Sequence, residues 1–557
     1  MFLPLNIDNI YGLLNINVIM GFLLIGLLNA LLMLSVSYKF LQVMQQCGYN
    51  GKEYMKWLIR KDNISFNALM MLSLLSALGF MLINMAFSFI NDYWVSYTGF
   101  SVYVLFLICY FINEFKKKEK VPLVVTKRMI RLIITFVLVV VLFSLLLILA
   151  VNLLAILFKG VLIANFRYAV ICFCPIIVPY LLLVAFYINL PFENAIINKY
   201  VKKCTLNLKE RKDLIKIGIT GSYGKTSVKE ILKVILSEKY KVSATPLSYN
   251  TPLGISKTVN RFDGTEEVFI AEMGARRVGD IKKLTEIVLP NVAVITGVVE
   301  QHLETFNKIE NIKKTKYEII ENMVDGKAVF SCDNQATREM FRKCKKPCVL
   351  AGLNVKSKPH VYASDIITSE NGTSFTLHVG ENLCECTTML LGKHNVSNIC
   401  LAVAVADMLG LTISEMSSAI SRLEPIKHRL ELIKSNGLYI LDDSYNANPE
   451  GIKCALDVLK TFKGNKYVVT PGIVELGFME NEKNFEFGKL LSKIANGVIL
   501  VGRARALKIR EGLLSNGYKP EHIYMVSSLE EAKKKITEIA KEGDAVLFEN
   551  DLPDKYL

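Results

Sequence analysis

The stretch 217–227, with the sequence IGITGSYGKTS, has residue types and spacing suited to binding phosphate. A short apolar strand pattern runs into a glycine turn, and apolar residues at helical spacing follow. Backbone N–H groups of such a turn, with the start of a helix, can surround phosphate oxygens. Lys225 would reach the β- and γ-phosphates and the Thr226 hydroxyl would bind Mg²⁺. Gly218 lies one residue earlier than in the strict phosphate-loop pattern. The backbone groups expected to contact phosphate are those of Gly221, Ser222 and Gly224.

Two further polar residues stand at the ends of predicted buried strands. Glu272 ends one such strand, and His302 follows the next, at 291–297. Strands and helices alternate from about 215 to 350, which predicts a doubly wound, mostly parallel sheet. Ligands of such sheets bind at the carboxyl ends of the strands. Thr226, Glu272 and His302 are therefore expected at one edge, where a carboxylate beside a phosphate loop can hold Mg²⁺.

The composition indicates a membrane part and a soluble part. The 557 residues have a net charge of +15 and are 52% hydrophobic, with a mean hydropathy of +0.34. The twelve cysteines show no paired framework, so we expect reduced thiols in a protein that faces the cytosol. The lysines crowd into loops between apolar segments. A membrane surface explains that charge, and no nucleic-acid partner is expected.

Five apolar runs are long enough, or nearly so, to cross about 30 Å of hydrocarbon. None of them contains Asp, Glu, Lys, Arg or His. We interpret 1–195 as a transmembrane region of five α-helical spans. The runs are 18–37, 66–90, 94–112, 132–158 and 168–190.

The charges of the loops predict an orientation in the cell membrane. The loop 38–65 carries five Lys or Arg residues and the loop 113–131 carries seven, whereas 1–17 and 91–93 carry none. Basic loops stay on the cytoplasmic side. The N-terminus is therefore expected outside, with the chain after residue 190 in the cytoplasm.

Seven motifs, in order, resemble those of the Mur ligases, the ATP-dependent amide-forming enzymes of peptidoglycan precursor synthesis. The resemblance covers about 211–557. It implies a P-loop-type ATP-binding domain with a mostly parallel sheet at 196–425 and a Rossmann-like domain at 426–557. The last motif is particular to the branch that adds D-alanyl-D-alanine to a muramyl-peptide. The motifs are Thr220–Thr226, Glu272–Ala275, His302–Glu304, Lys316–Ile319, His394–Asn398, His428–Glu431 and Asp442–Pro449.

The resemblance implies a reaction in two steps. The γ-phosphoryl group of ATP passes to a substrate carboxylate, and an incoming amine attacks the acyl phosphate to leave an amide. Such catalysis is mainly positioning and neutralisation of negative charge. Lys225 would hold the phosphates, and Thr226 with Glu272 would hold one Mg²⁺. His302 and a carbamylated Lys316 would serve a second metal.

The resemblance also implies contacts to the nucleoside and from the C-terminal domain. Asn334 and Asn395 or Asn398 would lie near adenine, and Asp443 would contact ribose. Arg429 would approach the phosphates when the domains close. Closure would exclude water from the acyl phosphate.

Three features depart from the family pattern. The membrane region stands where soluble members carry a domain for the UDP end of the substrate. Phe548–Asp554 replaces the usual Lys-Gly-Ser-Arg of the dipeptide-adding branch, and Asn484 replaces a histidine usual after Glu475–Gly477. The first two concern substrate recognition, and the ATP-binding motifs are intact.

Two other functions therefore stay open. One keeps the chemistry but uses a lipid-linked or polymeric carboxylate, as in poly-γ-glutamate synthesis. The other is a transporter or sensor with a regulatory nucleotide domain, which the charge-free spans disfavour. The sequence does not identify the acceptor, the amine donor or the oligomeric state.

Overall fold

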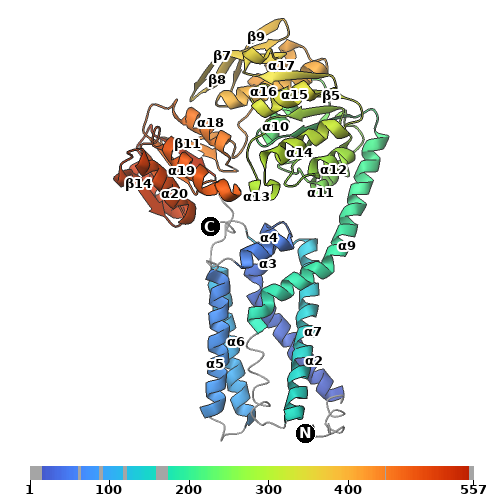
Figure 1. Cartoon of the computed structure of the whole chain (residues 1–557), viewed down its shortest axis with the longest axis vertical. Helices are drawn as coiled ribbons and strands as arrows, with labels where there is room; N and C mark the ends of the chain where they lie inside the picture. The colour runs from blue at the N-terminus through green and yellow to red at the C-terminus, as the bar shows by residue number, and fades with distance from the viewer. Residues whose placement is uncertain are drawn as a thin grey trace. The chain divides into compact units, whose positions relative to one another are not determined.

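The computed structural model divides the chain into two compact units (Figure 1). Among the described residues, the first unit comprises those up to 196, and the second comprises those from 197 to 550. The predicted domain limits, including the one at 425/426, stay predictions. The residues described are 16–59, 64–86, 92–116, 122–158, 174–445 and 447–550. No disulfide links the cysteines within these ranges.

The first unit is built from helices, and these cover the described parts of all five predicted apolar runs. Large apolar side chains on three of the helices are more than half exposed: Leu31 by 62%, Leu82 by 66% and Leu138 by 63%. Contiguous exposed apolar surface marks contact with lipid or with another protein. The helices are α2 (Ile16–Val36), α3 (Tyr38–Gln46), α4 (Gly51–Leu58), α5 (Ile64–Ala86), α6 (Asp92–Lys116), α7 (Lys127–Phe158) and the first part of α9 (Cys174–Glu210).

Length and composition alone qualify three of the described helical stretches as membrane spans. These are Ile19–Val36, Lys127–Ala150 and Cys174–Glu210. Phe66–Gly79 and Tyr103–Asn113 are apolar but shorter. Part of the fifth predicted run, 168–173, lies outside the described residues. A membrane region of five spans stays a prediction.

Helix α9 continues well past the fifth predicted apolar run, which ends at residue 190. Residues 191–210 form the C-terminal part of this 37-residue helix. Pro179 and Pro191 lie inside it. Each proline removes one helical hydrogen bond, yet a helix can continue past that loss with a kink.

The second unit contains a nine-stranded sheet with the order β2-β3-β1-β4-β5-β6-β7-β8-β9. Neighbouring strands from β2 to β7 are parallel, which confirms the predicted mostly parallel sheet, whereas β8 and β9 add an unpredicted antiparallel hairpin. The strands are β1 (Ile215–Thr220), β2 (Val242–Ala244), β3 (Val268–Glu272), β4 (Val292–Ile295), β5 (Lys327–Ser331), β6 (Cys348–Gly352), β7 (Val361–Ser369), β8 (Gly372–Val379) and β9 (Asn382–Thr388).

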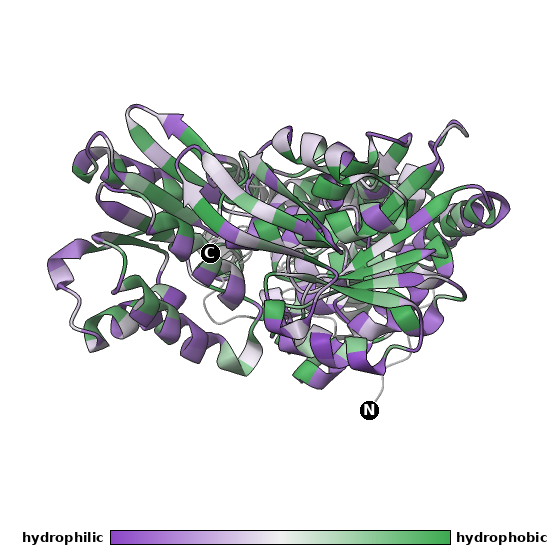
Figure 2. Ribbon diagram, turned by 90° about the horizontal axis from the view of Figure 1, so that it is seen from above, coloured by the Kyte–Doolittle hydropathy of each residue, from purple (hydrophilic) through white to green (hydrophobic). Residues whose placement is uncertain are grey.

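Alternate residues of these strands pack into two apolar layers. Ile217 and Ile219 belong to one layer, and Phe269 and Ala271 belong to the other. Figure 2 shows the hydrophobic colour along many of the strands. The first layer includes residues of α10 (Lys225–Leu236), α16 (Lys393–Met408) and α17 (Ile413–Ser421). The second includes residues of α11 (Pro252–Val259), α12 (Asp280–Val288), α13 (Leu303–Phe306), α14 (Ile309–Asn322) and α15 (Gln335–Lys343).

A second sheet follows, with the order β10-β11-β15-β12-β13-β14 and only β10 antiparallel to its neighbour. This arrangement confirms the expected Rossmann-like α/β domain. Its strands are β10 (Glu431–Ser435), β11 (Leu438–Asp443), β12 (Lys466–Thr470), β13 (Gly497–Val501), β14 (Ile523–Val526) and β15 (Ala545–Glu549). Its helices are α18 (Pro449–Leu459), α19 (Glu480–Leu491), α20 (Ala504–Ser515) and α21 (Leu529–Ile539).

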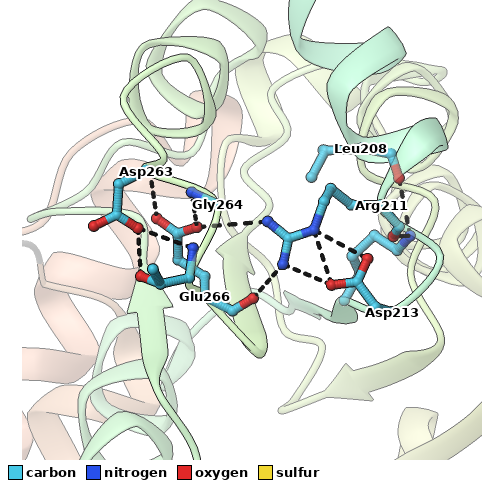
Figure 3. Close-up of polar contacts among 8 residues, drawn as sticks. Leu208, Arg211, Asp213, Asp263, Gly264 and Glu266 are labelled. Carbon is cyan, nitrogen blue, oxygen red and sulfur yellow. Dashed lines mark hydrogen bonds and ion pairs between the residues drawn. The ribbon is translucent and has the colours of Figure 1, made fainter.

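A polar network joins the end of α9 to the start of β1 (Figure 3). The Lys216 ammonium donates to the carbonyls of Leu208 and Arg211, both at 3.0 Å. Arg211 pairs with Asp213 at 2.7 Å and with Glu266 at 3.7 Å. Lys216 thus satisfies one carbonyl in the last turn of α9 and the carbonyl of the residue that follows the helix. These contacts use the amino end of β1, so the carboxyl end stays available for a binding site.

Candidate functional site

The loop between β1 and α10 has the shape of a phosphate cradle. A Cβ atom on Gly221 would lie 2.1 Å from Thr296 Oγ1, so only glycine fits there. Gly224 has a φ of 75°, and its Cβ would lie 2.8 Å from Asn398 Oδ1. A glycine tolerates both the positive φ and the close approach. The free N-terminus of α10 follows directly, which is the geometry that binds phosphate in other proteins.

Lys225 lies within this loop. Its Nζ donates to the carbonyls of Gly221 at 2.8 Å and Ser222 at 3.2 Å. Burial lowers the pKa of Lys225 to about 8; the charge of Glu272 opposes this shift and that of Arg429 adds to it. Lys225 and Arg429 thus both bring positive charge to the phosphate loop, which favours a polyanionic ligand.

Glu272 is the acidic centre of the site and is 1% exposed. Its Oε2 accepts a hydrogen bond from Thr226 Oγ1 at 2.9 Å, and its Oε1 accepts one from Asn250 Nδ2 at 3.0 Å. The Lys229 ammonium lies 3.6 Å from Oε2. A hydroxyl and a carboxylate side by side next to a phosphate loop are the oxygen ligands that Mg²⁺ prefers. The donor set therefore fits the implied metal.

His302 begins the short helix α13 with a φ of 54° and pairs with Glu475 through Nδ1. Arg276 lies 3.6 Å from the other oxygen of Glu475. Burial lowers the pKa of His302, and Glu475 opposes that shift. The role of His302 at a metal stays a prediction. Glu475 comes from the C-terminal part of the unit and was not among the predicted site residues, although it begins one of the motifs noted in the sequence.

Lys316 lies on α14 and is 3% exposed. Burial holds the pKa of Lys316 well below its ordinary value, and the charge of Lys225 adds to the shift, while Asp280 and Glu318 oppose it. A neutral amine is the form that can react with carbon dioxide. The environment of Lys316 therefore suits carbamylation.

The three asparagines predicted near adenine make structural hydrogen bonds. Asn334 caps α15, where its Oδ1 accepts from Thr337 N at 3.1 Å and its Nδ2 donates to Val298 O at 3.0 Å. Asn395 Nδ2 donates to the carbonyl of Leu391 at 2.9 Å, and Asn398 Nδ2 donates to Asn395 Oδ1 at 3.5 Å. Asn398 also lies against Gly224 of the phosphate loop. Their contact with adenine stays a prediction.

Arg429 is held in a strained segment of the chain. Its neighbours His428 and Leu430 have φ values of 60° and 53°. His428 Nδ1 pairs with Asp442 Oδ2 at 2.7 Å, which helps to fix that backbone. The Arg429 guanidinium lies over the ring of Tyr445, with its carbon 4.1 Å from the ring centre. Strain of this kind is kept where function requires one side-chain direction.

Two carboxyl groups face each other at the ends of β11 and β15, where Asp443 pairs in register with Glu549. Burial raises the pKa of Asp443 to about 6, and Arg429 opposes that shift. Burial, and then the charge of Asp443, raise the pKa of Glu549 well above its ordinary value. Neither oxygen of Glu549 has a hydrogen-bond partner among the described residues.

Replacing Glu549 by glutamine is expected to raise the thermal midpoint, and by more at pH 8 than at pH 5. The native carboxyl binds its proton more tightly than the unfolded one, so wild-type stability falls as pH rises between the two pKa values. The glutamine amide does not titrate, so the variant does not lose stability as the pH rises. At pH 8 its free energy of unfolding should exceed that of the wild type by about 1–3 kcal/mol. Thermal unfolding of the full chain measures it, with the exposed Glu521→Gln as control. A larger gain at pH 5 would contradict the prediction.

Asn484, which stands where the family usually has histidine, is fully buried. Its Oδ1 accepts from Ile473 N at 2.9 Å, and its Nδ2 donates to Ile473 O at 3.0 Å and to Glu480 O at 2.8 Å. The side chain therefore fixes the segment that leads to Glu475. In this chain the residue has a structural role.

Comparison with known proteins identifies two family domains. Residues 219–406 match the Mur ligase middle domain, and residues 428–549 match the Mur ligase glutamate ligase domain. Over 338 residues the chain is 30% identical to the UDP-N-acetylmuramoyl-tripeptide–D-alanyl-D-alanine ligase of Bacillus subtilis, covering 60% of this chain and 72% of that enzyme. The same-named enzyme of Escherichia coli is 28% identical over 263 residues, which are 58% of its length.

Solved structures agree with these matches. The chain superposes on MurF ligase from Thermotoga maritima in complex with ADP with a TM-score of 0.58 and 29% identity, covering 64% of this chain and 80% of that one. MurF from Acinetobacter baumannii gives a TM-score of 0.59 at 25% identity, covering 64% and 77%.

Proposed function

Because the chain belongs to the Mur ligase family, we propose that it is an ATP-dependent ligase that joins D-alanyl-D-alanine to a UDP-N-acetylmuramoyl-tripeptide in peptidoglycan synthesis. The observation that carries the proposal is the contact of the Thr226 hydroxyl with the buried Glu272 carboxylate, beside a glycine loop that holds Lys225. This arrangement suits transfer of a phosphoryl group, which depends on fixed positive charge and a metal site.

The proposed roles follow from where each side chain lies. The phosphate loop and Lys225 bind the phosphates of ATP, and Thr226 and Glu272 hold Mg²⁺. Mg²⁺, when bound, neutralises charge on the transferring phosphoryl group. Arg429 adds positive charge from the C-terminal domain, at 426–557, to the ATP-binding domain, at 196–425. Together these groups would favour formation of an acyl phosphate, which the incoming amine then attacks.

Lys316 is proposed to act as its carbamate. The lowered pKa of the buried amine favours its neutral form, which takes up carbon dioxide, and the resulting anion would support the second metal together with His302. The low pKa of Lys316 supports this proposal, since an ammonium at this position would repel both Mg²⁺ and Lys225.

The first unit is proposed to anchor the enzyme to the cell membrane as a multi-pass region with the catalytic domains in the cytoplasm. Three helical stretches of sufficient length and apolarity and the many exposed leucines support this location. The basic loops support the proposed orientation, with the N-terminus outside.

A second candidate acceptor is a lipid-linked or polymeric carboxylate. Two observations favour it. The helical first unit lies outside both matched family domains, and Phe548–Asp554 stands where the dipeptide-adding branch usually has Lys-Gly-Ser-Arg. An enzyme held at the membrane would meet such an acceptor directly.

The test is a product assay with the full chain in nanodiscs. With Mg-ATP, UDP-linked muramyl-tripeptide and D-alanyl-D-alanine, we expect the amide product by mass spectrometry and one phosphate released per amide formed. Omitting the dipeptide should prevent amide formation. If product arises only from a lipid-linked or polymeric carboxylate, the second candidate is correct. If ATP binds but no carboxylate yields an amide, the proposed ligase function is wrong.

A further inference from the structure

Tyr445 contacts both Arg429 and Ser248, which belong to different domains of the site. Its ring lies under the Arg429 guanidinium, 4.1 Å from the guanidinium carbon to the ring centre. Its hydroxyl donates a hydrogen bond to Ser248 Oγ, on the segment that follows β2. Tyr445 is 47% exposed, so packing alone does not fix its direction.

The segment 246–250, which carries Ser248, is also tied to the metal carboxylate. The Asn250 side chain donates to Glu272 Oε1 at 3.0 Å, and the Asn250 carbonyl accepts from Gly274 N at 2.9 Å. The fully buried Lys229 donates to the carbonyl of Leu247 and lies 3.6 Å from Glu272. Movement of this segment would therefore shift the Glu272 carboxylate, because Asn250 and Lys229 both contact it.

We propose that Tyr445 is a positioning residue that latches the C-terminal domain onto segment 246–250 and thereby aims Arg429 at the phosphate loop. The inference rests on the proposed function. The continuous set of contacts runs from Glu272 through Asn250 and Ser248 to Tyr445 and Arg429.

Two physical effects support the latch. A guanidinium over an aromatic ring is held in one direction by the ring's negative face. A hydroxyl–hydroxyl hydrogen bond between the two domains forms only when they are close together, so it favours the closed state. The phosphate loop belongs wholly to the first sheet, and nucleotide can bind it without the latch. Loss of the latch should therefore lower kcat more than it raises the KM for ATP.

The experiment is a double-variant cycle in the full chain. Tyr445→Phe and Ser248→Ala each remove one partner of the hydrogen bond, and each should lower kcat roughly fivefold with little change in KM. The double variant should be no worse than either single variant, because the two residues act through one contact. Tyr445→Leu, which also removes the ring, should lower kcat about tenfold further.

A second readout does not depend on amide formation. With Mg-ADP, hydrogen exchange at the amides of segment 246–250 should slow in the wild type and should not slow in Tyr445→Phe or Ser248→Ala. Tyr524→Phe is the matched control. The ammonium of Lys535 lies 4.9 Å from the centre of the Tyr524 ring, but Tyr524 is on β14, the edge strand at the end of the sheet away from β10 and β11. Additive losses in the double variant, or unchanged ADP-dependent protection in Tyr445→Phe, would overturn the latch. Protection that behaves as expected without any amide product would instead count against the ligase function.

Discussion

Replacing Lys316 by alanine is expected to lower the rate of amide formation by about 10²- to 10³-fold, the loss that follows removal of one group that stabilises charge in a transition state. Burial holds the pKa of Lys316 well below its ordinary value, which suits carbamylation, and the carbamate is an anion, so the variant loses an anion rather than a cation. Small carboxylates should fit the space left by the side chain and restore part of the activity. The measurement is the rate at increasing acetate concentration, at constant ionic strength.

Comparing an anionic with a cationic rescuing molecule tests whether Lys316 acts as a carbamate. Acetate should restore activity and methylamine should not, and removal of dissolved carbon dioxide should slow the wild-type enzyme. Lys314→Ala is the matched control, because Lys314 lies two residues earlier on α14 with its side chain exposed. Near wild-type activity of Lys316→Ala, or rescue by methylamine, would exclude the carbamate.

Much of the fold of the second unit could be predicted because its strands are buried on both faces. The runs of β4 and β13 are apolar throughout and that of β3 is apolar up to Glu272, and each of the three is followed by a helical pattern. That alternation predicts a parallel sheet. The hairpin of β8 and β9 was not predicted. In β8 buried residues alternate with half-buried ones, β9 is largely exposed, and both strands carry polar residues such as Thr376 and Glu385, so neither contains the continuous apolar run on which the prediction of the parallel sheet rested.

The glycine loop and the strand-end carboxylate could be located from the sequence because their positions follow from local rules. A glycine turn before a helix fixes the loop, and the carboxyl ends of parallel strands share one edge. Thr226 and Glu272 are 46 residues apart in the chain and are hydrogen-bonded in the structure, at 2.9 Å.

Contacts between the two sheets could not be predicted in the same way. Glu475 pairs with His302, and Tyr445 is hydrogen-bonded to Ser248. The members of the second pair are 197 residues apart in the sequence. Such pairs depend on how the two domains pack, which no local periodicity encodes. A strand-end motif can show that a residue is near a site, but its partner comes only from the tertiary structure.

Replacing Glu272 by glutamine is the second change with a large expected effect. The amide keeps the size of the side chain and can still accept from Thr226, but it lacks the charge that attracts Mg²⁺. We expect the Mg²⁺ concentration for half-maximal activity to rise by about 10- to 100-fold, as when groups that support a metal site are removed. At saturating Mg²⁺ part of the rate should return, because the shape of the site is retained.

Two measurements separate this effect from a general loss of nucleotide binding. Affinity for ADP without metal should change little in Glu272→Gln, because the phosphate loop and Lys225 are intact. Glu267→Gln serves as the control, since Glu267 directly precedes the same strand at its amino end and is exposed. An unchanged Mg²⁺ titration would remove Glu272 from the metal site. Equal weakening of metal-free and metal-bound ADP would show that Glu272 shapes the phosphate loop through Thr226 and leaves Mg²⁺ to other oxygens.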